Sequence, residues 1–311
     1  MNLFWYLFAV ALDLLLITLI TSYVCFRLVF YARKKEIKEE YPIPDGEIYE
    51  EYRAQMTEWI KEMRAREHRV VEITSFDGLT LRGKYFEYEK GAPIELLLHG
   101  YRGWAERDLC GGIERCRMLG HNVLVVDHRA SGESDGHVIT FGINESRDCE
   151  AWIDFILREI DPDAQIYLGG VSMGAATVMI TVGRKLPKQV VGAVADCGYT
   201  SAREIIQKVI REMKLPPKIL YPFVRLGARL FGHFDPDQTS PIEAMKNATV
   251  PVLFFHGDTD DFVPFEMSKE NYDACVTKKH LVTVKGAGHG LAYPKDPHTY
   301  VREIKTFFGN E

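Results

Sequence analysis

The chain has 311 residues, enough for one domain with a sizeable core and some attached segments. Its 38 basic and 44 acidic residues give a formal net charge of −6, so nothing in the composition suggests a nucleic-acid partner. The six cysteines have no metal-binding spacing, so we expect no metal site and reduced, mostly buried thiols, which favours a domain facing the cytoplasm.

The N-terminus is apolar over residues 3–26, where Asp13 is the only charged side chain. A helix of this length, rising about 1.5 Å per residue, can cross a hydrocarbon core of roughly 30 Å. No basic residues precede it and no small-residue cleavage site follows it, so residues 1–30 are predicted to be a retained transmembrane anchor rather than a signal peptide. Asp13 would lie mid-span at a cost of roughly 2.5–3.5 kcal/mol, either protonated, paired with a neighbouring helix, or functional.

Basic residues cluster directly after this apolar segment. The positive-inside rule then places the N-terminus outside the cell and the rest of the chain in the cytoplasm, as a single-pass protein of the cell membrane. The cluster consists of Arg27, Arg33, Lys34, Lys35 and Lys38.

Residues 31–69 are predicted to form a charged linker and a helix. Prolines and a glycine in the segment 41–46 interrupt any continuous helix, and residues 47–68 then have the charge pattern of an amphipathic helix. We expect this helix to be a spacer that packs on the following domain, or one that lies on the membrane surface. Its apolar positions are Tyr49, Tyr52, Met56, Ile60 and Met63.

The segment from residue 70 to 311 has the pattern of one α/β domain. Residues 70–75 and 79–86 are predicted to pair as a hairpin around Asp77-Gly78. From Ile94 onward, apolar strand-like runs alternate with helical patterns, which predicts a mostly parallel sheet covered on both faces.

The most specific motif is Gly170-Val171-Ser172-Met173-Gly174, a G-x-S-x-G pattern. Strand-like residues precede it and helix-like residues follow, so Ser172 is predicted to lie on a sharp strand-to-helix turn. The flanking glycines leave room for the turn, which exposes the hydroxyl at a helix N-terminus, where the dipole favours negative charge. We therefore expect Ser172 to be a catalytic nucleophile.

A serine nucleophile needs a base that takes its proton and a carboxylate that orients the base. His289 is the predicted base, because it lies in a glycine-rich loop after the last predicted strand and an imidazole can accept and return a proton near neutral pH. Asp260 is the predicted carboxylate, because it fits the pattern H-G-x-x-D-x-x-V-P after an apolar strand. Asp196 at the end of another strand is a rival, whereas Asp258 and Asp261 are expected to cap the turn or face solvent.

Two backbone N–H groups should stabilise the oxyanion of the tetrahedral intermediate. One is predicted at Met173, directly after the nucleophile, and the other at Tyr101, in the loop that follows the strand at 94–98. The alternative interpretation of His99-Gly100 in this loop is an ordinary tight turn, and we expect His99 itself to be structural.

Together these motifs resemble the α/β-hydrolase superfamily, in particular bacterial serine esterases and lysophospholipases related to the serine aminopeptidases. The resemblance covers residues 70–311 and includes the block 127–134, where many relatives have D-x-R-G-x-G-x-S and this chain has Ala130 in place of the first glycine. It implies an eight-stranded, mostly parallel sheet with helices on both faces, hydrolysis of an acyl ester or amide, and no cofactor. The block shapes a turn near the cleft, so the substitution is expected to leave activity intact.

Residues 200–248 separate two predicted strands and exceed an ordinary connection, so we expect a helical cap over the active site. Between residues 203 and 229 there are seven basic and two acidic side chains. A solvated outer face would explain this charge. The alternative is a lid that meets anionic lipid headgroups through Lys208, Arg211 and Lys214 and opens onto an apolar acyl pocket.

The sequence therefore predicts a membrane-anchored serine hydrolase of carboxylic esters, with small-molecule, lipid and lysolipid esters as candidate substrates. A serine aminopeptidase-like peptidase is an alternative that would need an acidic site for the substrate amine. A non-catalytic binding protein on the same fold is a further alternative, which the complete set of serine, acid and histidine disfavours.

Overall fold

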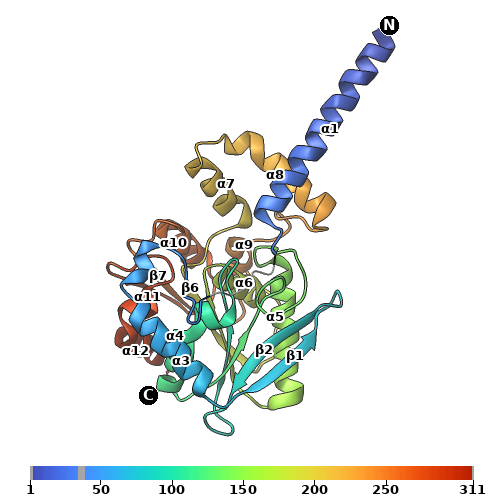
Figure 1. Cartoon of the computed structure of the whole chain (residues 1–311). Coiled ribbons are helices and arrows are strands. Elements are labelled where there is room, and N and C mark those ends of the chain that lie inside the picture. Colours follow the sequence, from blue (N-terminus) through green and yellow to red (C-terminus); the bar gives the residue numbers. More distant parts are fainter. Residues whose placement is uncertain (1–2, 34–38, 310–311) are drawn as a thin grey trace.

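The computed structural model describes residues 3–33 and 39–309, and its centre is an eight-stranded sheet in the order β1-β2-β4-β3-β5-β6-β7-β8 (Figure 1). β1 pairs antiparallel with β2 and β2 antiparallel with β4, and all other neighbours are parallel. The predicted eight-stranded, mostly parallel sheet is confirmed. Its strands are β1 (Arg69–Thr74), β2 (Thr80–Phe86), β3 (Ile94–Leu98), β4 (Asn122–Val126), β5 (Ile166–Val171), β6 (Val190–Asp196), β7 (Val252–Gly257) and β8 (Lys279–Val284).

Helices cover both faces of the sheet. Successive residues of a strand point to opposite sides, so strands that are apolar at successive positions need a helical layer on each face. Leu96 and Leu98 of β3 pack in the core with α5, α6 and α9, whereas Leu97 packs with α3 and α4 on the other face. The helices are α1 (Leu3–Val29), α2 (Glu47–Glu50), α3 (Arg53–Ala65), α4 (Ala105–Leu119), α5 (Ile143–Phe155) with a π-helical turn at Ile156–Ile160, α6 (Met173–Val182), α7 (Ala202–Glu212), α8 (Pro217–Phe231), α9 (Pro241–Met245), α10 (Phe265–Ala274), α11 (Ala292–Lys295) and α12 (Pro297–Phe308).

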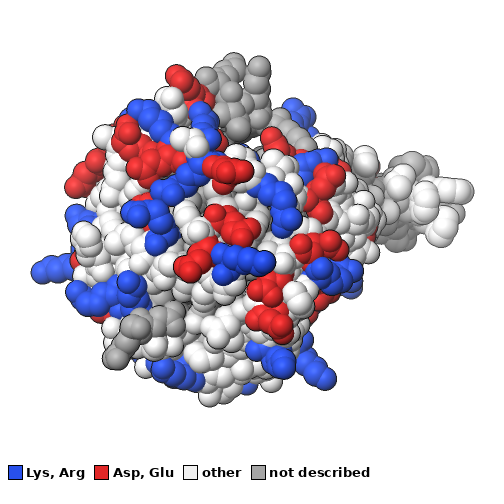
Figure 2. All heavy atoms as spheres, turned by 90° about the horizontal axis from the view of Figure 1, so that it is seen from below, with Lys and Arg blue, Asp and Glu red and all other residues white. Residues whose placement is uncertain are grey.

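The carboxyl ends of β3, β5, β7 and β8 meet at one edge of the sheet, because these strands run parallel. In Figure 1, α7, α8 and α1 lie above this edge. The opposite end of the molecule is seen from below in Figure 2, where acidic and basic side chains of the described residues are interspersed.

α1 is long and apolar enough to cross a membrane, with a mean hydropathy of 2.4 over a window in which no residue is buried. Its last turns, in contrast, pack on α8, where Ser22 and Phe26 are buried. A methyl group on Gly227 of α8 would lie 2.2 Å from the Ser22 carbonyl oxygen, so only glycine permits this approach. Lys34, Lys35 and Lys38 of the predicted basic cluster lie outside the described residues.

The segment after α1 is joined to the domain at several points. Tyr31 forms an antiparallel bridge with Val138, and Met56, Ile60 and Met63 of α3 are buried against the sheet domain. The helix expected over residues 47–68 is divided into α2 and α3 by a turn at residues 51–52.

Candidate active site

Ser172 lies between the last residue of β5 and the first residue of α6, with φ at 56° and ψ at −115°. A positive φ is unfavourable for a residue with a side chain and costs about 1–3 kcal/mol. Glycines on both sides make this turn possible, because a methyl group on Gly170 would lie 2.3 Å from the carbonyl carbon of Gly174, and one on Gly174 would lie 2.0 Å from the Leu98 carbonyl oxygen. The sequence therefore contains the small residues that a strained strand-to-helix turn requires.

The structure brings the three predicted side chains into one hydrogen-bonded chain. His289 Nε2 lies 2.9 Å from Ser172 Oγ, and His289 Nδ1 lies 2.8 Å from Asp260 Oδ2. Because a carboxylate can only accept, Nδ1–H donates to Asp260, which leaves Nε2 free to accept the serine proton. This arrangement can activate the Ser172 hydroxyl as a nucleophile.

Asp260 is held by its own turn. Its Oδ1 accepts the backbone N–H groups of Phe262 and Val263, both at 2.9 Å, and its side chain is fully buried. Burial alone would raise the pKa of this carboxyl, but hydrogen bonds from His256 and His289 outweigh it and hold the pKa well below its usual range. Asp260 therefore stays ionised at neutral pH.

His256, at the end of β7, is a supporting residue that the sequence analysis missed. Its Nε2 lies 3.1 Å from Asp260 Oδ2 and 2.8 Å from the Val263 carbonyl oxygen, so this nitrogen carries the proton. Its Nδ1 lies 2.6 Å from Ser268 Oγ and accepts a hydrogen bond from that hydroxyl. The motif H-G-x-x-D could have predicted this contact. His256 and Asp260 lie at the two ends of a short turn after a strand, where their side chains can face each other.

The other aspartates that were weighed against Asp260 have different partners. Asp196 at the end of β6 accepts the Tyr300 hydroxyl at 3.1 Å, and burial raises its pKa to about 6. Asp258 accepts the Gly286 N–H at 2.6 Å and so caps its turn, and Asp261 is exposed.

The loop after β3 places the second predicted oxyanion donor beside Ser172. Met173 is the first residue of α6, so its N–H has no acceptor inside the helix, and the Tyr101 N–H bonds to no residue that the structure describes. Arg102 has a positive φ of 54°, and the Gly100 N–H donates to Asp108 Oδ2 at 3.1 Å, which fixes the turn. Both N–H groups are thus available to an oxyanion.

The side chains of this loop bind the end of α1, which the sequence analysis did not foresee. The Tyr101 hydroxyl donates to the Val29 carbonyl at 2.6 Å, and the Arg102 guanidinium donates to the Leu28 carbonyl at 2.7 Å. The last carbonyl groups of a helix have no partner within it, so these bonds cap α1. The loop after β3, which carries the proposed oxyanion donor Tyr101 (the oxyanion loop), is therefore joined directly to the N-terminal helix.

His99 and the block 127–134 shape the cleft from the neighbouring strands. His99 Nε2 accepts the His128 N–H at 2.9 Å, and burial lowers the pKa of His99 to about 4, so it is neutral and structural. Ala130 has a positive φ of 61°, a conformation that glycine adopts at lower cost, which fits the glycine of the family pattern at this position. A methyl group on Gly132 would lie 2.1 Å from Asp127 Oδ2, so this second glycine is required.

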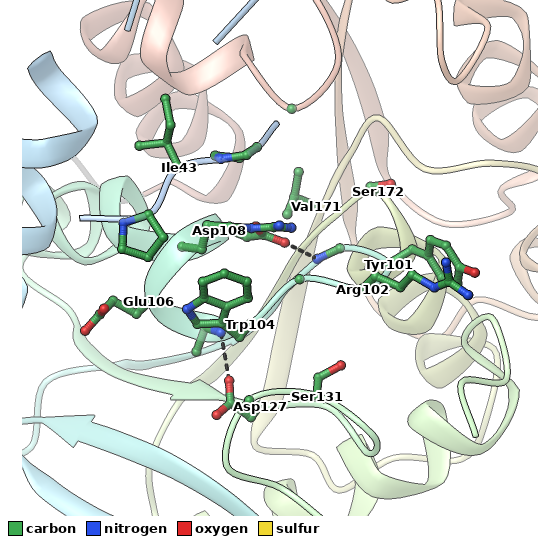
Figure 3. Close-up of a pocket in the computed structure, with 18 of the residues that line it drawn as sticks. Ile43, Tyr101, Arg102, Trp104, Glu106, Asp108, Asp127, Ser131, Val171 and Ser172 are labelled. Atoms are coloured by element: carbon green, nitrogen blue, oxygen red, sulfur yellow. Dashed lines mark hydrogen bonds and ion pairs between the residues drawn. The ribbon is translucent and has the colours of Figure 1, made fainter. Parts of the chain in front are cut away.

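A cavity of about 1160 Å³ opens beside Ser172 and His289. Figure 3 shows Val171 and Ser172 on one side of it, with Tyr101, Arg102 and Trp104 of the oxyanion loop nearby. Further wall is supplied by residues 27–33 and 39–49, which connect α1 to α3. Residues 200–248 do not line it. The expected cap instead packs beside the cavity on α1, and its Lys208 reaches the Asp261 carbonyl at 2.6 Å.

Three ligand-type side chains, Cys197, Asp260 and His289, have atoms within 4.8 Å of one another, a spacing that could hold a metal ion. Burial raises the pKa of the Cys197 thiol well above its usual value, so the thiolate needed as a ligand does not form at neutral pH. Asp260 and His289 already bond to each other. The group therefore suits proton transfer better than metal binding.

The chain is similar to hydrolases along most of its length. A family profile described as alpha/beta hydrolase fold matches residues 96–232, and one described as TAP-like protein matches residues 233–310. The structure of the Pyrococcus furiosus esterase Pf2001 superposes with a TM-score of 0.66 at 24% identity, covering 86% of this chain and 96% of the esterase, and this likeness shows the fold.

Two relatives each match about three fifths of this chain. The protein YqkD of Bacillus subtilis is 28% identical over 193 residues, which are 62% of this chain and 63% of YqkD. The lysophosphatidylserine lipase ABHD12 of Danio rerio is 25% identical over 209 residues, which are 62% of this chain and 50% of the lipase. The fold and the two family matches, which together span residues 96–310, show that the chain belongs to the α/β-hydrolase superfamily.

Proposed function

We propose that this chain is a membrane-anchored serine hydrolase that cleaves carboxylic esters through an acyl-enzyme intermediate. The observation that carries the proposal is the hydrogen-bonded chain from Ser172 Oγ to His289 Nε2 and from His289 Nδ1 to Asp260. These bonds have the lengths that a nucleophile, its base and the orienting carboxylate need.

In the proposed reaction, Ser172 Oγ attacks the ester carbonyl carbon while His289 Nε2 takes the serine proton. The carbonyl oxygen becomes negatively charged and accepts the N–H groups of Tyr101 and Met173. The intermediate then collapses, the C–O bond to the alcohol breaks, and His289 returns the proton to the departing alkoxide oxygen. Water then attacks the acyl-enzyme carbonyl while His289 takes its proton. The second intermediate collapses, the acid is released, and His289 returns the proton to Ser172 Oγ.

Lipid or lysolipid esters are the proposed substrate class. The cavity beside Ser172 is large enough for an acyl chain and a headgroup, and part of its wall comes from the end of α1. A membrane-spanning α1 would hold that wall at the lipid surface. A lysophosphatidylserine lipase among the relatives supports the same class.

Retention of α1 as an anchor is supported by its packing. Ser22, Phe26 and Phe30 are buried in the same core as the cap helices, so cleavage after the apolar segment would remove part of the folded domain. We infer an N-out, C-in orientation from the basic residues that follow α1, among which Arg27 and Arg33 are described. Protease digestion of intact cells tests it, because loss of the catalytic domain to external protease would contradict this orientation.

A peptidase is a second candidate, because acidic side chains line the cavity. Asp45 and Glu47 both do so, and neither has an ion-pair partner in the part of the chain that the structure describes. Such carboxylates could bind a substrate amine. If they do, Asp45→Asn with Glu47→Gln should raise KM for short peptides and leave KM for uncharged esters unchanged.

The test of the main proposal uses the full-length protein in detergent or in vesicles, because a shorter protein would lose part of the cavity wall. Wild type and Ser172→Ala are compared on soluble esters of increasing acyl length, on lysophospholipids and on short peptides. A fluorophosphonate probe, which labels activated serines covalently, reports the nucleophile without knowledge of the substrate. Labelling of wild type alone supports Ser172. Equal labelling and equal turnover in both proteins would contradict the proposal and favour a non-catalytic role.

A further inference from the structure

The elbow between α7 and α8, residues 211–219, projects from the cap at the end of the molecule from which α1 leaves the domain (Figure 1). Three of its apolar side chains are exposed: Met213 by 61%, Leu215 by 43% and Ile219 by 63%. Single exposed apolar residues are ordinary on a protein surface, but a group of them on one protrusion marks an interaction surface.

The apolar surface continues along α8. Ile219, Phe223, Leu226 and Leu230 follow one another at intervals of four, three and four residues, so they form a stripe on one side of the helix. Leu230 is 44% exposed. The opposite side of α8 is buried in the cap core through Tyr221, Val224 and Ala228. Phe223 and Leu226 are half-buried, so the helix has a second apolar side that the domain covers only in part.

The cations of the cap separate into two groups. Most are paired within the cap: Arg203 with Asp237, Arg225 and Arg229 with Asp235, and Lys208 with Glu212. Arg211, Lys214 and Lys218 have no ion-pair partner among the described residues, and all three lie on the elbow. Lys208, which was a candidate for lipid contact only if the basic face is not simply solvated, is thus held by the protein instead.

The position of α1 identifies what covers this surface. α8 packs on the last turns of α1 through Gly227, and the rings of Tyr23 and Phe231 lie 5.1 Å apart edge to face. The preceding residues 3–17 of α1 are all exposed. If that apolar stretch lies in a bilayer, its junction with α8 lies at the bilayer surface, beside the exposed elbow.

We propose that the elbow, residues 211–219, inserts Met213, Leu215 and Ile219 into the bilayer that holds α1, while Arg211, Lys214 and Lys218 contact anionic lipid headgroups. Apolar side chains flanked by cations are the pattern of segments that lie in a membrane interface. The elbow and α1 then hold the domain at two points, with the sheet edge that carries Ser172 toward the lipid. This inference rests on the proposed membrane anchorage of α1.

The test places an environment-sensitive fluorophore at single introduced cysteines in the full-length protein, reconstituted in vesicles with spin-labelled lipids that carry the quencher at either a shallow or a deep acyl position. The labelled variant is Ile219→Cys. The matched control is Val276→Cys, which is similarly exposed at 64% and lies between α10 and β8, near the amino end of that parallel strand. Cys25 is the one native cysteine that is not buried, so labelling of the unsubstituted chain gives the background.

Quenching at position 219, with none at position 276, is the expected result. A third label, Leu12→Cys in the exposed part of α1, reports whether the anchor itself is in the bilayer. It is read with the deep quencher, because this position lies near the middle of the proposed span. Quenching at positions 12 and 276 but not at 219, or at position 12 alone, would overturn the elbow proposal. Absence of quenching at position 12 would instead show that the anchor proposal fails, and the elbow proposal with it. Fluorophosphonate labelling of each variant separately reports the active site.

The charge component is tested with the triple variant Arg211→Gln, Lys214→Gln, Lys218→Gln. In the labelled Ile219→Cys protein, adding anionic phosphatidylglycerol to phosphatidylcholine vesicles should increase quenching at position 219. In the triple variant with the same label, this increase should be absent. The control is Lys185→Gln, Lys188→Gln, Lys305→Gln, which removes the same charge from exposed sites outside the cap. Equal lipid dependence in both triple variants would overturn the assigned role of the elbow cations.

Discussion

The proposed catalytic edge of the sheet, which carries Ser172, differs from the region formed by α1 and the cap in how its polar and apolar side chains are partnered. At the catalytic edge, Asp260 accepts two backbone N–H groups and two histidines, so its charge is compensated within the chain. At the other end, apolar side chains such as Ile219 are exposed and Lys214 and Lys218 lack a counter-ion among the described residues. In the first region the buried charge has its hydrogen-bond partners within the folded chain. In the second, we infer that lipid covers the exposed apolar side chains and supplies the counter-ions.

Replacement of the nucleophile tests the completeness of the catalytic edge most directly. Ser172→Ala should lower kcat on every ester by about 10⁶-fold, because the acyl-enzyme can no longer form. Steady-state hydrolysis of a soluble ester and of a lysophospholipid measures it, with circular dichroism as the control for folding. A large loss on one ester and none on the other would show that the proposed serine chemistry does not account for both.

The two buried carboxylates beside the site should differ by orders of magnitude in their effect on activity. Asp260→Asn should lower kcat by about 10⁴-fold, because an amide no longer selects the His289 tautomer that accepts at Nε2. Asp196→Asn is the matched control, since Asp196 bonds to Tyr300 rather than to His289, and it should leave kcat almost unchanged. The reverse outcome would reassign the acid to Asp196.

This contrast also separates what the sequence could predict from what it could not. The turn at Ser172 and the loops of Asp260 and His289 were predictable, because each follows a strand and parallel strands bring their carboxyl ends together. The contact of Gly227 with Ser22 could not be predicted. The two residues are far apart in the sequence, and neither lies in a local pattern that indicates such a distant partner. The division of cap cations into paired and unpaired groups likewise depends on which carboxylates the fold brings near, and composition alone suggested only a basic face.

Asp196 should also control stability as pH changes. Its pKa is raised to about 6 by burial, against about 3.9 in an unfolded chain, so the folded protein binds this proton more tightly. Its protonation therefore stabilises the fold at acidic pH, and that contribution is lost as pH rises from about 4 through 6, by roughly 1–3 kcal/mol. Asp196→Asn should be more stable than wild type at pH 8, with a difference that shrinks toward pH 4.

Thermal unfolding of both proteins across this pH range measures the difference. The pH dependence of stability that Asp260 contributes has the opposite sign. Because its pKa is lowered in the folded protein, it adds stability at neutral pH that is lost on acidification. An Asn variant at position 196 whose midpoint follows that of wild type at every pH would contradict the raised pKa.

The smallest expected effect tests whether the two regions are coupled. Tyr101→Phe keeps the proposed oxyanion N–H but removes the hydroxyl that donates to the Val29 carbonyl of α1. If the end of α1 helps to position this loop, kcat should fall by about tenfold with little change in KM, less than the 10²–10³-fold loss that follows removal of an oxyanion donor. The matched deletion is Tyr88→Phe, whose hydroxyl donates to the Ile113 carbonyl at 3.3 Å outside the cavity.

A loss of kcat in Tyr101→Phe alone would mean that α1 contributes to catalysis as well as to attachment, because the missing bond joins the loop to α1 while the proposed oxyanion donor is the backbone N–H. Equal kcat values in both variants would mean that Arg102 and the Asp108 contact to Gly100 suffice to hold the loop. The catalytic edge would then be complete without the membrane helix, and the two regions would be joined in space but independent in function.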